Sequence, residues 1–202
     1  MKKLIQTLKN IWSIEELRGK ILFTLMMIAI YRIGSHIVLP GIDPTALKTG
    51  ESNTGILGLI DAFSGGAFNN ASIFALGIMP YISASIFMQL MTVLVPRFQK
   101  MQKEGDSGRK KITQYTRYLT VAVTLLQASA YVTYLRGMTA QSGGLMAGLS
   151  PSTFWLTTVV VLTAGTMFVM WMGEKITDKG LGNGTSLIIM IGILARLPQS
   201  FI

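Results

Sequence analysis

Residues 73–95 read IFALGIMPYISASIFMQLMTVLV, a run of 23 residues without a charge. At about 1.5 Å of rise per residue, a helix of this length can cross the hydrocarbon core of a bilayer, which is about 30 Å thick. Gly77 and Pro80 lie in its first third. Because proline removes a backbone hydrogen bond inside a helix, the run predicts a helix kinked near Pro80. The freed carbonyl must then be buried in protein or face water, since lipid offers no donor.

The stretch before this run is too short to cross a bilayer. Residues 55–68 are moderately apolar and are interrupted by Asp61 and by the cluster Ser64-Gly65-Gly66. A spanning helix needs about 20 residues, so we predict a short helix enclosed by protein. Residues 55–95 together then form a broken element that enters the membrane and turns back.

Other apolar runs have about the length of a membrane span. With the opening run they predict an all-α, polytopic membrane protein of five transmembrane helices, at residues 21–39, 73–95, 118–135, 154–172 and 185–202. Lysines beside an apolar stripe predict a cytoplasmic amphipathic helix on the membrane surface over residues 1–20. The sequence stops on Phe201-Ile202 without a polar tail, and we expect it to be part of a longer chain.

Arg32 lies inside the first predicted span, together with His36. A charged side chain at a helix centre costs about 2.5–3.5 kcal/mol on insertion scales. Two placements stay open. The guanidinium extends outward to the interface, which the general tendency of long basic side chains favours, or it faces protein or water.

The charge distribution predicts the orientation. Only 13% of the residues are charged and 50% are hydrophobic, whereas soluble domains carry about 25% charged residues. Of the 18 Lys and Arg residues, 14 lie in the N-terminal segment and in the polar stretches 97–117 and 174–184. By the positive-inside rule these segments, and the N-terminus, are cytoplasmic.

The basic segment, residues 97–117, is predicted to be a polar loop. It contains Arg97, Lys103, Arg109, Lys110 and Lys111 among its seven basic residues. Such a segment either lies in water and only sets the orientation of the protein in the membrane, or it binds anionic lipid, an RNA backbone or an acidic partner. The sequence leaves these alternatives open.

The residues that catalysis or metal binding requires are missing. Cysteine is absent and His36 is the single histidine, so no metal site or cofactor is expected. Asp61 is the single acidic residue near the broken element, and one carboxylate cannot serve as both the general acid and the general base of a hydrolase. The glycine-rich stretch 180–184 lacks the Lys-Ser/Thr ending of a phosphate-binding loop and predicts a tight turn.

An apolar stripe follows the predicted break. Ile78, Ile82 and Ile86 recur at i, i+4 and i+8. Helix packing is the ordinary interpretation of such a stripe, but a stripe lining a pore would look the same in the sequence.

Four stretches resemble the SecY family, the protein-conducting channels of the Sec translocon. They are Arg32-Ile33-Gly34-Ser35 to Pro40-Gly41-Ile42-Asp43, Phe63-Ser64-Gly65-Gly66 with residues 71–86, Lys103-Glu104-Gly105 to Tyr115-Thr116-Arg117-Tyr118, and Gly165-Thr166-Met167-Phe168 to Gly182-Asn183-Gly184. The resemblance extends from about residue 18 onward. It implies the N-terminal half of a bacterial-type channel over residues 21–202, the first half of a ten-helix inverted repeat.

The same resemblance implies roles for individual residues. Residues 55–70 would be the re-entrant plug helix that seals the closed channel, including Phe63, Ser64, Gly65 and Gly66. The pore ring would comprise Ile78, Ile82, Ile86 and Ile189. The lateral gate would include Ser83, Gln89 and Gln127. Thr185 stands where an apolar ring residue is expected.

The implied function is passive conduction of unfolded polypeptides across the bacterial plasma (inner) membrane, with lateral release of hydrophobic segments into the bilayer. The implied partners are the SecE and SecG subunits, a SecA motor or a translating ribosome, signal peptides and nascent chains, and membrane lipids. No enzymatic activity is implied. The rival hypothesis is half of a secondary transporter, since broken helices also build solute sites. No ionisable residue lies around Pro80, which favours the channel.

Overall fold

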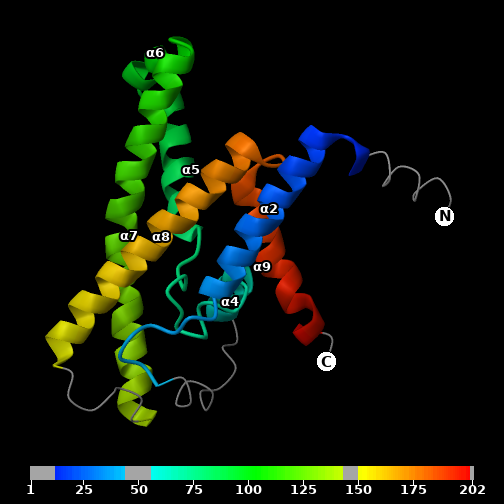
Figure 1. Ribbon diagram of the computed structural model, residues 1–202. Helices are drawn as coiled ribbons and strands as arrows, with labels where there is room; N and C mark the ends of the chain where they lie inside the picture. Colours follow the sequence, from blue (N-terminus) through cyan, green and yellow to red (C-terminus); the bar gives the residue numbers. More distant parts are fainter. Residues whose placement is uncertain (1–11, 44–55, 143–149, 201–202) are drawn as a thin grey trace.

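The computed structural model describes residues 12–43, 56–142 and 150–200 of the chain, and over these residues the fold is helical (Figure 1). The helices are α2 (Glu15–Gly34), α4 (Ile56–Ser64), α5 (Met79–Leu94), α6 (Pro96–Lys103), α7 (Asp106–Ser142), α8 (Pro151–Lys179) and α9 (Gly184–Ser200). The predicted all-α class is confirmed. Residues 1–11 of the predicted amphipathic helix and residues 201–202 of the fifth span lie outside the described residues.

Helix α2 begins earlier and ends earlier than the predicted span 21–39. It ends at Gly34, where the bonds change from i→i−4 to i→i−3: the His36 amide donates to the Ile33 carbonyl at 3.1 Å and the Ile37 amide to the Gly34 carbonyl at 3.2 Å. The Ser35 hydroxyl also donates to the Arg32 carbonyl at 2.7 Å. Val38 then pairs with Ser72 in an isolated antiparallel bridge. Residues 35–39 are therefore a non-helical connection.

Residues 73–95 are not one kinked helix, and that prediction is wrong. Residues 73–78 form turns, and α5 starts only at Met79. Pro80 therefore lies in the first turn of α5, where its missing N–H costs no helical hydrogen bond. The turn segment, residues 65–78, connects α4 to α5 and packs inside the protein, as irregular backbone in a membrane protein must.

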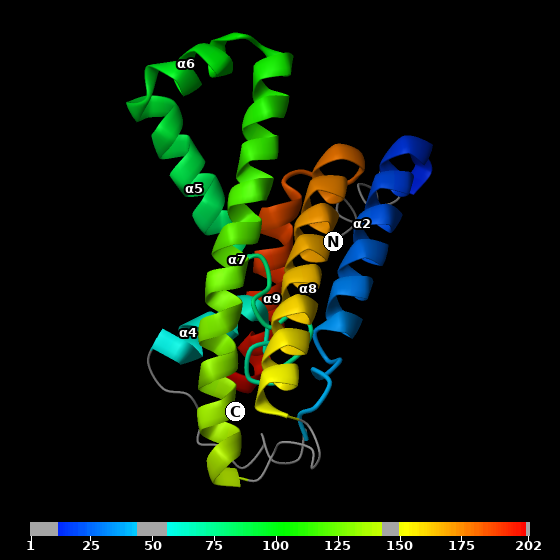
Figure 2. The same cartoon turned by 90° about the vertical axis from the view of Figure 1, so that its left-hand side faces the viewer.

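The basic segment is helical, and the predicted loop is wrong. Helix α6 and the first three turns of α7 occupy it, with a tight turn at Glu104 and Gly105. Helices α5 and α6 meet at 98°, with Pro96 opening α6. Together α5, α6 and the start of α7 form a hairpin that projects beyond the other helices (Figure 2). Polar composition indicated exposure to water correctly but did not exclude helix, since Lys, Arg, Gln and Met are good helix formers.

The second polar stretch is also shorter than predicted. Helix α8 extends to Lys179, so the turn is confined to residues 180–183. Asn183 caps α9, its side-chain oxygen accepting the Thr185 amide at 3.1 Å. The Thr24 hydroxyl of α2 accepts the Leu181 amide at 3.2 Å and ties this turn to α2.

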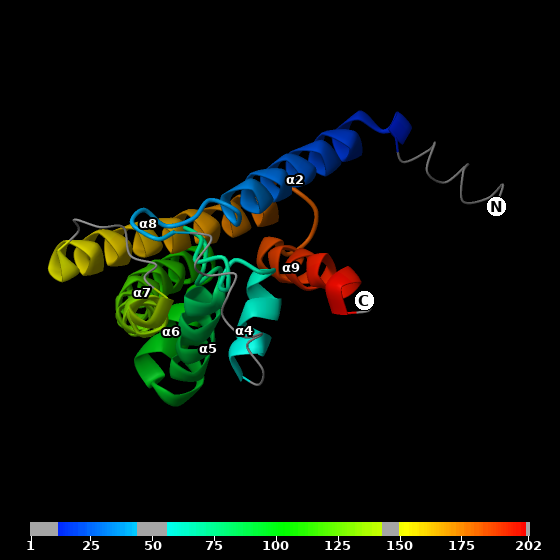
Figure 3. The same ribbon diagram turned by 90° about the horizontal axis from the view of Figure 1, so that it is seen from below.

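Two clusters of buried apolar side chains hold the helices together. One joins α7, α8 and the turn segment, with Val132, Leu162 and Ala71 fully buried. The other joins α2, α8, α9 and the start of α5 around Met172 and Ile188. Seen from below, α2 and α8 lie along one side and α5, α6 and α7 along the other (Figure 3). Helix α4 lies against α9.

Two described helices are long and apolar enough to cross a membrane on their own, α7 within residues 106–137 and α8. A third is obtained if α5 and α6 are counted as one bent span. Large apolar side chains such as Leu126 and Val93 are exposed, as expected of a surface that faces lipid. Several apolar spans are thus present, while the count of five stays a prediction.

Candidate functional site

Helix α4 and the turn after it contain the residues predicted to be the plug. The helix has nine residues, and Gly65 and Gly66 follow it with φ of +67° and +92°. Such angles favour glycine and let the chain reverse sharply. The Ser64 hydroxyl donates to the Asp61 carbonyl at 3.0 Å and accepts the Phe68 amide at 3.1 Å. The turn is therefore closed by its own side chains.

Asp61 has a structural role that the sequence did not reveal. Its side chain is fully buried, and its two carboxylate oxygens accept the backbone amide of Asn69 at 2.8 Å and the Asn69 side-chain amide at 2.9 Å. Both bonds join α4 to the turn segment. Among the described residues, no group of three or more His, Cys, Asp or Glu side chains could hold a metal ion.

Side chains from two neighbouring helices bond to carbonyls at the end of α4 and in the turn segment. Arg32 Nη1 donates to the Gly65 carbonyl at 3.2 Å, and the Tyr31 hydroxyl donates to the Ser64 carbonyl at 3.3 Å. The Tyr131 hydroxyl of α7 donates to the Phe68 carbonyl at 2.6 Å. Of the two placements left open for Arg32, the structure has the one that faces protein, and the outward extension is wrong.

The four predicted ring isoleucines have different environments. Ile78 is 5% exposed and belongs to the cluster around Met172 and Ile188. Ile82 and Ile189 are half-buried and pack against the same cluster, whereas Ile86, one turn further along α5, is 53% exposed. The structure thus brings three of the four together.

Thr185 is explained by helix capping. Its hydroxyl donates to the Asn183 side-chain oxygen at 2.5 Å, next to the amide contact that starts α9. This bond holds the side chain of Asn183, the capping residue of α9, and an apolar side chain at position 185 could not form it.

The predicted gate residues lie on α5 and α7. The Ser83 hydroxyl donates to the Met79 carbonyl at 3.2 Å, and the Gln89 amide donates to Ser85 at 3.5 Å, so these bonds stay within α5. Gln127 is half-buried and lines a mainly apolar groove of about 300 Å³ between α4, the start of α5 and α7.

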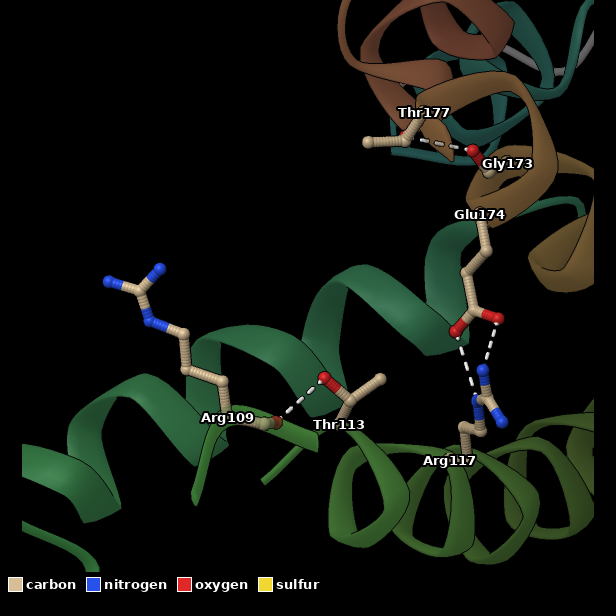
Figure 4. Close-up of polar contacts among 6 residues, drawn as sticks. All are labelled: Arg109, Thr113, Arg117, Gly173, Glu174 and Thr177. Carbon is tan, nitrogen blue, oxygen red and sulfur yellow. Dashed lines mark hydrogen bonds and ion pairs between the residues drawn. The ribbon is translucent and has the colours of Figure 1, made fainter. Parts of the chain in front are cut away.

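The basic residues predicted to be cytoplasmic are divided between two helices. All are exposed, with Arg97 and Lys103 on α6 and Arg109, Lys110 and Lys111 on α7. Further along α7, Arg117 forms a bidentate ion pair with Glu174 of α8. Its Nε donates to Oε1 at 3.0 Å and its Nη2 to Oε2 at 2.6 Å (Figure 4). The Arg109 side chain points away from this pair (Figure 4). The pair was not predicted, although Arg117 directly precedes the predicted span 118–135 and Glu174 closely follows the predicted span 154–172.

Comparison with known proteins assigns the chain to a family. A family model described as SecY matches residues 72–202, more than half of the sequence. The chain belongs to the SecY family. The protein translocase subunit SecY of Streptomyces scabiei is 50% identical, over 92% of this chain and 44% of that protein. The SecY subunit of Aquifex aeolicus is 48% identical, over 96% of this chain and 46% of that protein.

The fold agrees with that assignment. A solved structure titled "The structure of a protein conducting channel" superposes with a TM-score of 0.59 at 16% identity, covering 89% of this chain and 37% of that chain. At this identity the likeness shows the SecY channel fold alone. The chain spans less than half the length of the SecY relatives named above, 44% and 46%. What a complete SecY-family protein does therefore comes to this chain as a proposal.

Proposed function

We propose that the chain is the N-terminal half of a SecY-family channel that passes unfolded polypeptides across a membrane and releases hydrophobic segments sideways into lipid. The observation that supports this proposal best is the broken element. Its nine-residue helix α4 is too short to span a bilayer, and the chain turns back through residues 65–78 into α5. A short helix that packs against α9 suits a seal that can leave its place, because it is too short to be anchored across the bilayer.

The proposed pore lining follows from the isoleucines on α5 and α9. Ile82 and Ile189 lie at the edge of one cluster, and Ile86 continues the same stripe of α5 into exposed surface. An apolar constriction resists wetting when it is empty and so limits ion leakage. Ile78 would support the ring from behind, since it is buried against α8 and α9.

The second half of the channel would be a homologous set of helices in inverted orientation, which brings the total to ten spans. Its gate wall would face Ser83, Gln89 and Gln127. The basic segment and the N-terminus would be cytoplasmic in a bacterial plasma membrane, by the positive-inside rule. SecE and SecG would be partner subunits, and SecA or a ribosome would supply the substrate chain.

Site-specific crosslinking tests the channel. A photoreactive amino acid replaces Ile82 in the full-length protein, reconstituted with its partner subunits and loaded with an arrested secretory polypeptide. We expect an adduct with the polypeptide. The matched control position is Leu126 on α7, which is 75% exposed and should react with lipid instead.

Two outcomes would count against the proposal. Equal adducts at both positions would mean that the polypeptide does not pass along α5. Absence of any polypeptide adduct, with uptake of a small solute by the same vesicles, would favour the transporter hypothesis.

A further inference from the structure

The C-terminal end of α4 is held by side chains of α2. Arg32 and Tyr31 lie 33 positions before the residues whose carbonyls they contact, Gly65 and Ser64. The last carbonyls of a helix have no partner within it, so they need donors from elsewhere. They also carry the negative end of the helix dipole, which a guanidinium stabilises. Tyr31 supplies a donor to Ser64, the last residue of α4, and Arg32 supplies one to Gly65, the residue that follows it, with its charge at the negative end of the dipole.

Helix α9 also contacts this end of α4. A Cβ atom added to Gly192 would lie 2.8 Å from the Phe63 carbonyl oxygen, and one added to Gly65 would lie 2.9 Å from Gly192 Cα. These distances are shorter than a carbon atom tolerates, so the two backbones touch. The end of α4 is thus enclosed between α2 and α9.

Besides its packing against α9, the end of α4 has two kinds of side-chain hydrogen bond among the described residues. Those of Asp61 with Asn69 and of Ser64 with Phe68 join α4 to its own turn and would move with it. Those of Arg32 and Tyr31 reach another helix and must break if α4 leaves. Part of the α4 surface is left uncovered by the described residues, since Leu59 is 61% and Phe63 43% exposed.

We propose that Arg32, assisted by Tyr31, is a positioning residue that latches the end of α4 in the resting channel. Displacement of α4 then requires the contact of Arg32 with the Gly65 carbonyl to break. The inference rests on the proposed function, in which α4 is the channel's plug. Arginine suits the role because it stays charged and presents several donors in a rigid fork.

Hydrogen exchange of the full-length protein with its partner subunits, in lipid nanodiscs, tests the latch. In Arg32→Gln we expect the amides of residues 56–70 to exchange about tenfold faster, the effect of losing one charge-assisted bond. Arg32→Lys should give a smaller rise, since it keeps the charge. The control is Arg117→Gln, which removes the ion pair between α7 and α8. It should leave the exchange of residues 56–70 unchanged.

Two results would overturn the latch. One is wild-type exchange of residues 56–70 in Arg32→Gln, and the other is an equal rise in the control, which would indicate general loosening. If Arg32→Gln does not assemble, Tyr31→Phe replaces it, because that change removes only the hydroxyl contact. We expect a rise of about threefold there, and no rise would overturn the latch equally.

Polypeptide translocation by the same preparations separates this inference from the proposed function. Wild-type protein that translocates no polypeptide would refute the channel, whatever the exchange shows. Active wild-type protein, with unchanged exchange in Arg32→Gln, would refute the latch alone. Active protein whose resting ion conductance rises together with exchange in Arg32→Gln would support both.

Discussion

The ion pair of Arg117 with Glu174 should contribute a measurable coupling free energy between α7 and α8. Its two bonds of 3.0 Å and 2.6 Å are parallel and charge-assisted, which is the strongest geometry available to such a pair. Solvent weakens it, because the side chains are 46% and 19% exposed. Exposed pairs couple by about 0.2–1 kcal/mol, and we expect the upper end, about 1 kcal/mol.

A double-mutant cycle on the full-length protein measures that coupling. The four proteins are the wild type, Arg117→Gln, Glu174→Gln and the double variant, and the quantity is the free energy of unfolding in mixed micelles. Arg117→Gln should cost more than Glu174→Gln, since it leaves the less exposed carboxylate without its cation. The coupling should fall as salt is raised. Coupling below about 0.2 kcal/mol at low salt would refute the reasoning.

Three further predictions concern single side chains. Tyr131→Phe should lower the free energy of unfolding by about 1 kcal/mol, since the buried Phe68 carbonyl loses the Tyr131 hydroxyl and keeps only the Ala71 amide, at 3.2 Å, while the same change at the exposed Tyr118 should have little effect. Thr158→Val should keep or raise the free energy of unfolding, because the buried Thr158 hydroxyl has no hydrogen-bond partner within the described part of the chain. A loss above about 1 kcal/mol would instead reveal a bound water at this hydroxyl. Ile82→Asp should make the resting full-length channel conduct ions, and unchanged conductance in a planar bilayer would argue against the pore ring.

Composition and apolar runs were enough to predict the helical class and the short helix before residue 73. The apolar runs at 118–135 and 154–172 fall inside α7 and α8, because a long uncharged run has few alternatives to a helix in lipid. The helix ends were predicted less well. Helix α7 extends about three turns before its apolar run, and α8 two turns beyond, since polar residues with good helix propensity continue a helix into water.

The partners of the site residues could not be predicted from local sequence. Arg32 and Gly65 are separated by 33 positions, and nothing in either neighbourhood indicates their contact. The role of Asp61 depends on a turn that brings Asn69, eight positions later in the sequence, next to its carboxylate. Pro80 shows the limit of a rule taken alone, since proline either kinks a helix or starts one, and the turns before Met79 decide which.

The bonds of the turn segment indicate where movement of α4 would stop. The end of α4 is bonded to α2 by side chains, which can rotate away. Further along, the Leu39 amide donates to the Ala71 carbonyl at 2.8 Å and the Ile73 amide to the Ile37 carbonyl at 3.0 Å, so these residues are joined backbone to backbone. Breaking that bridge would expose several peptide groups at once, each costly without water. We therefore expect the amides of Leu39 and Ile73 to stay protected from exchange in Arg32→Gln, even where α4 exchanges faster. Equal loss of protection at both places would show that α4 and the turn segment open as one unit.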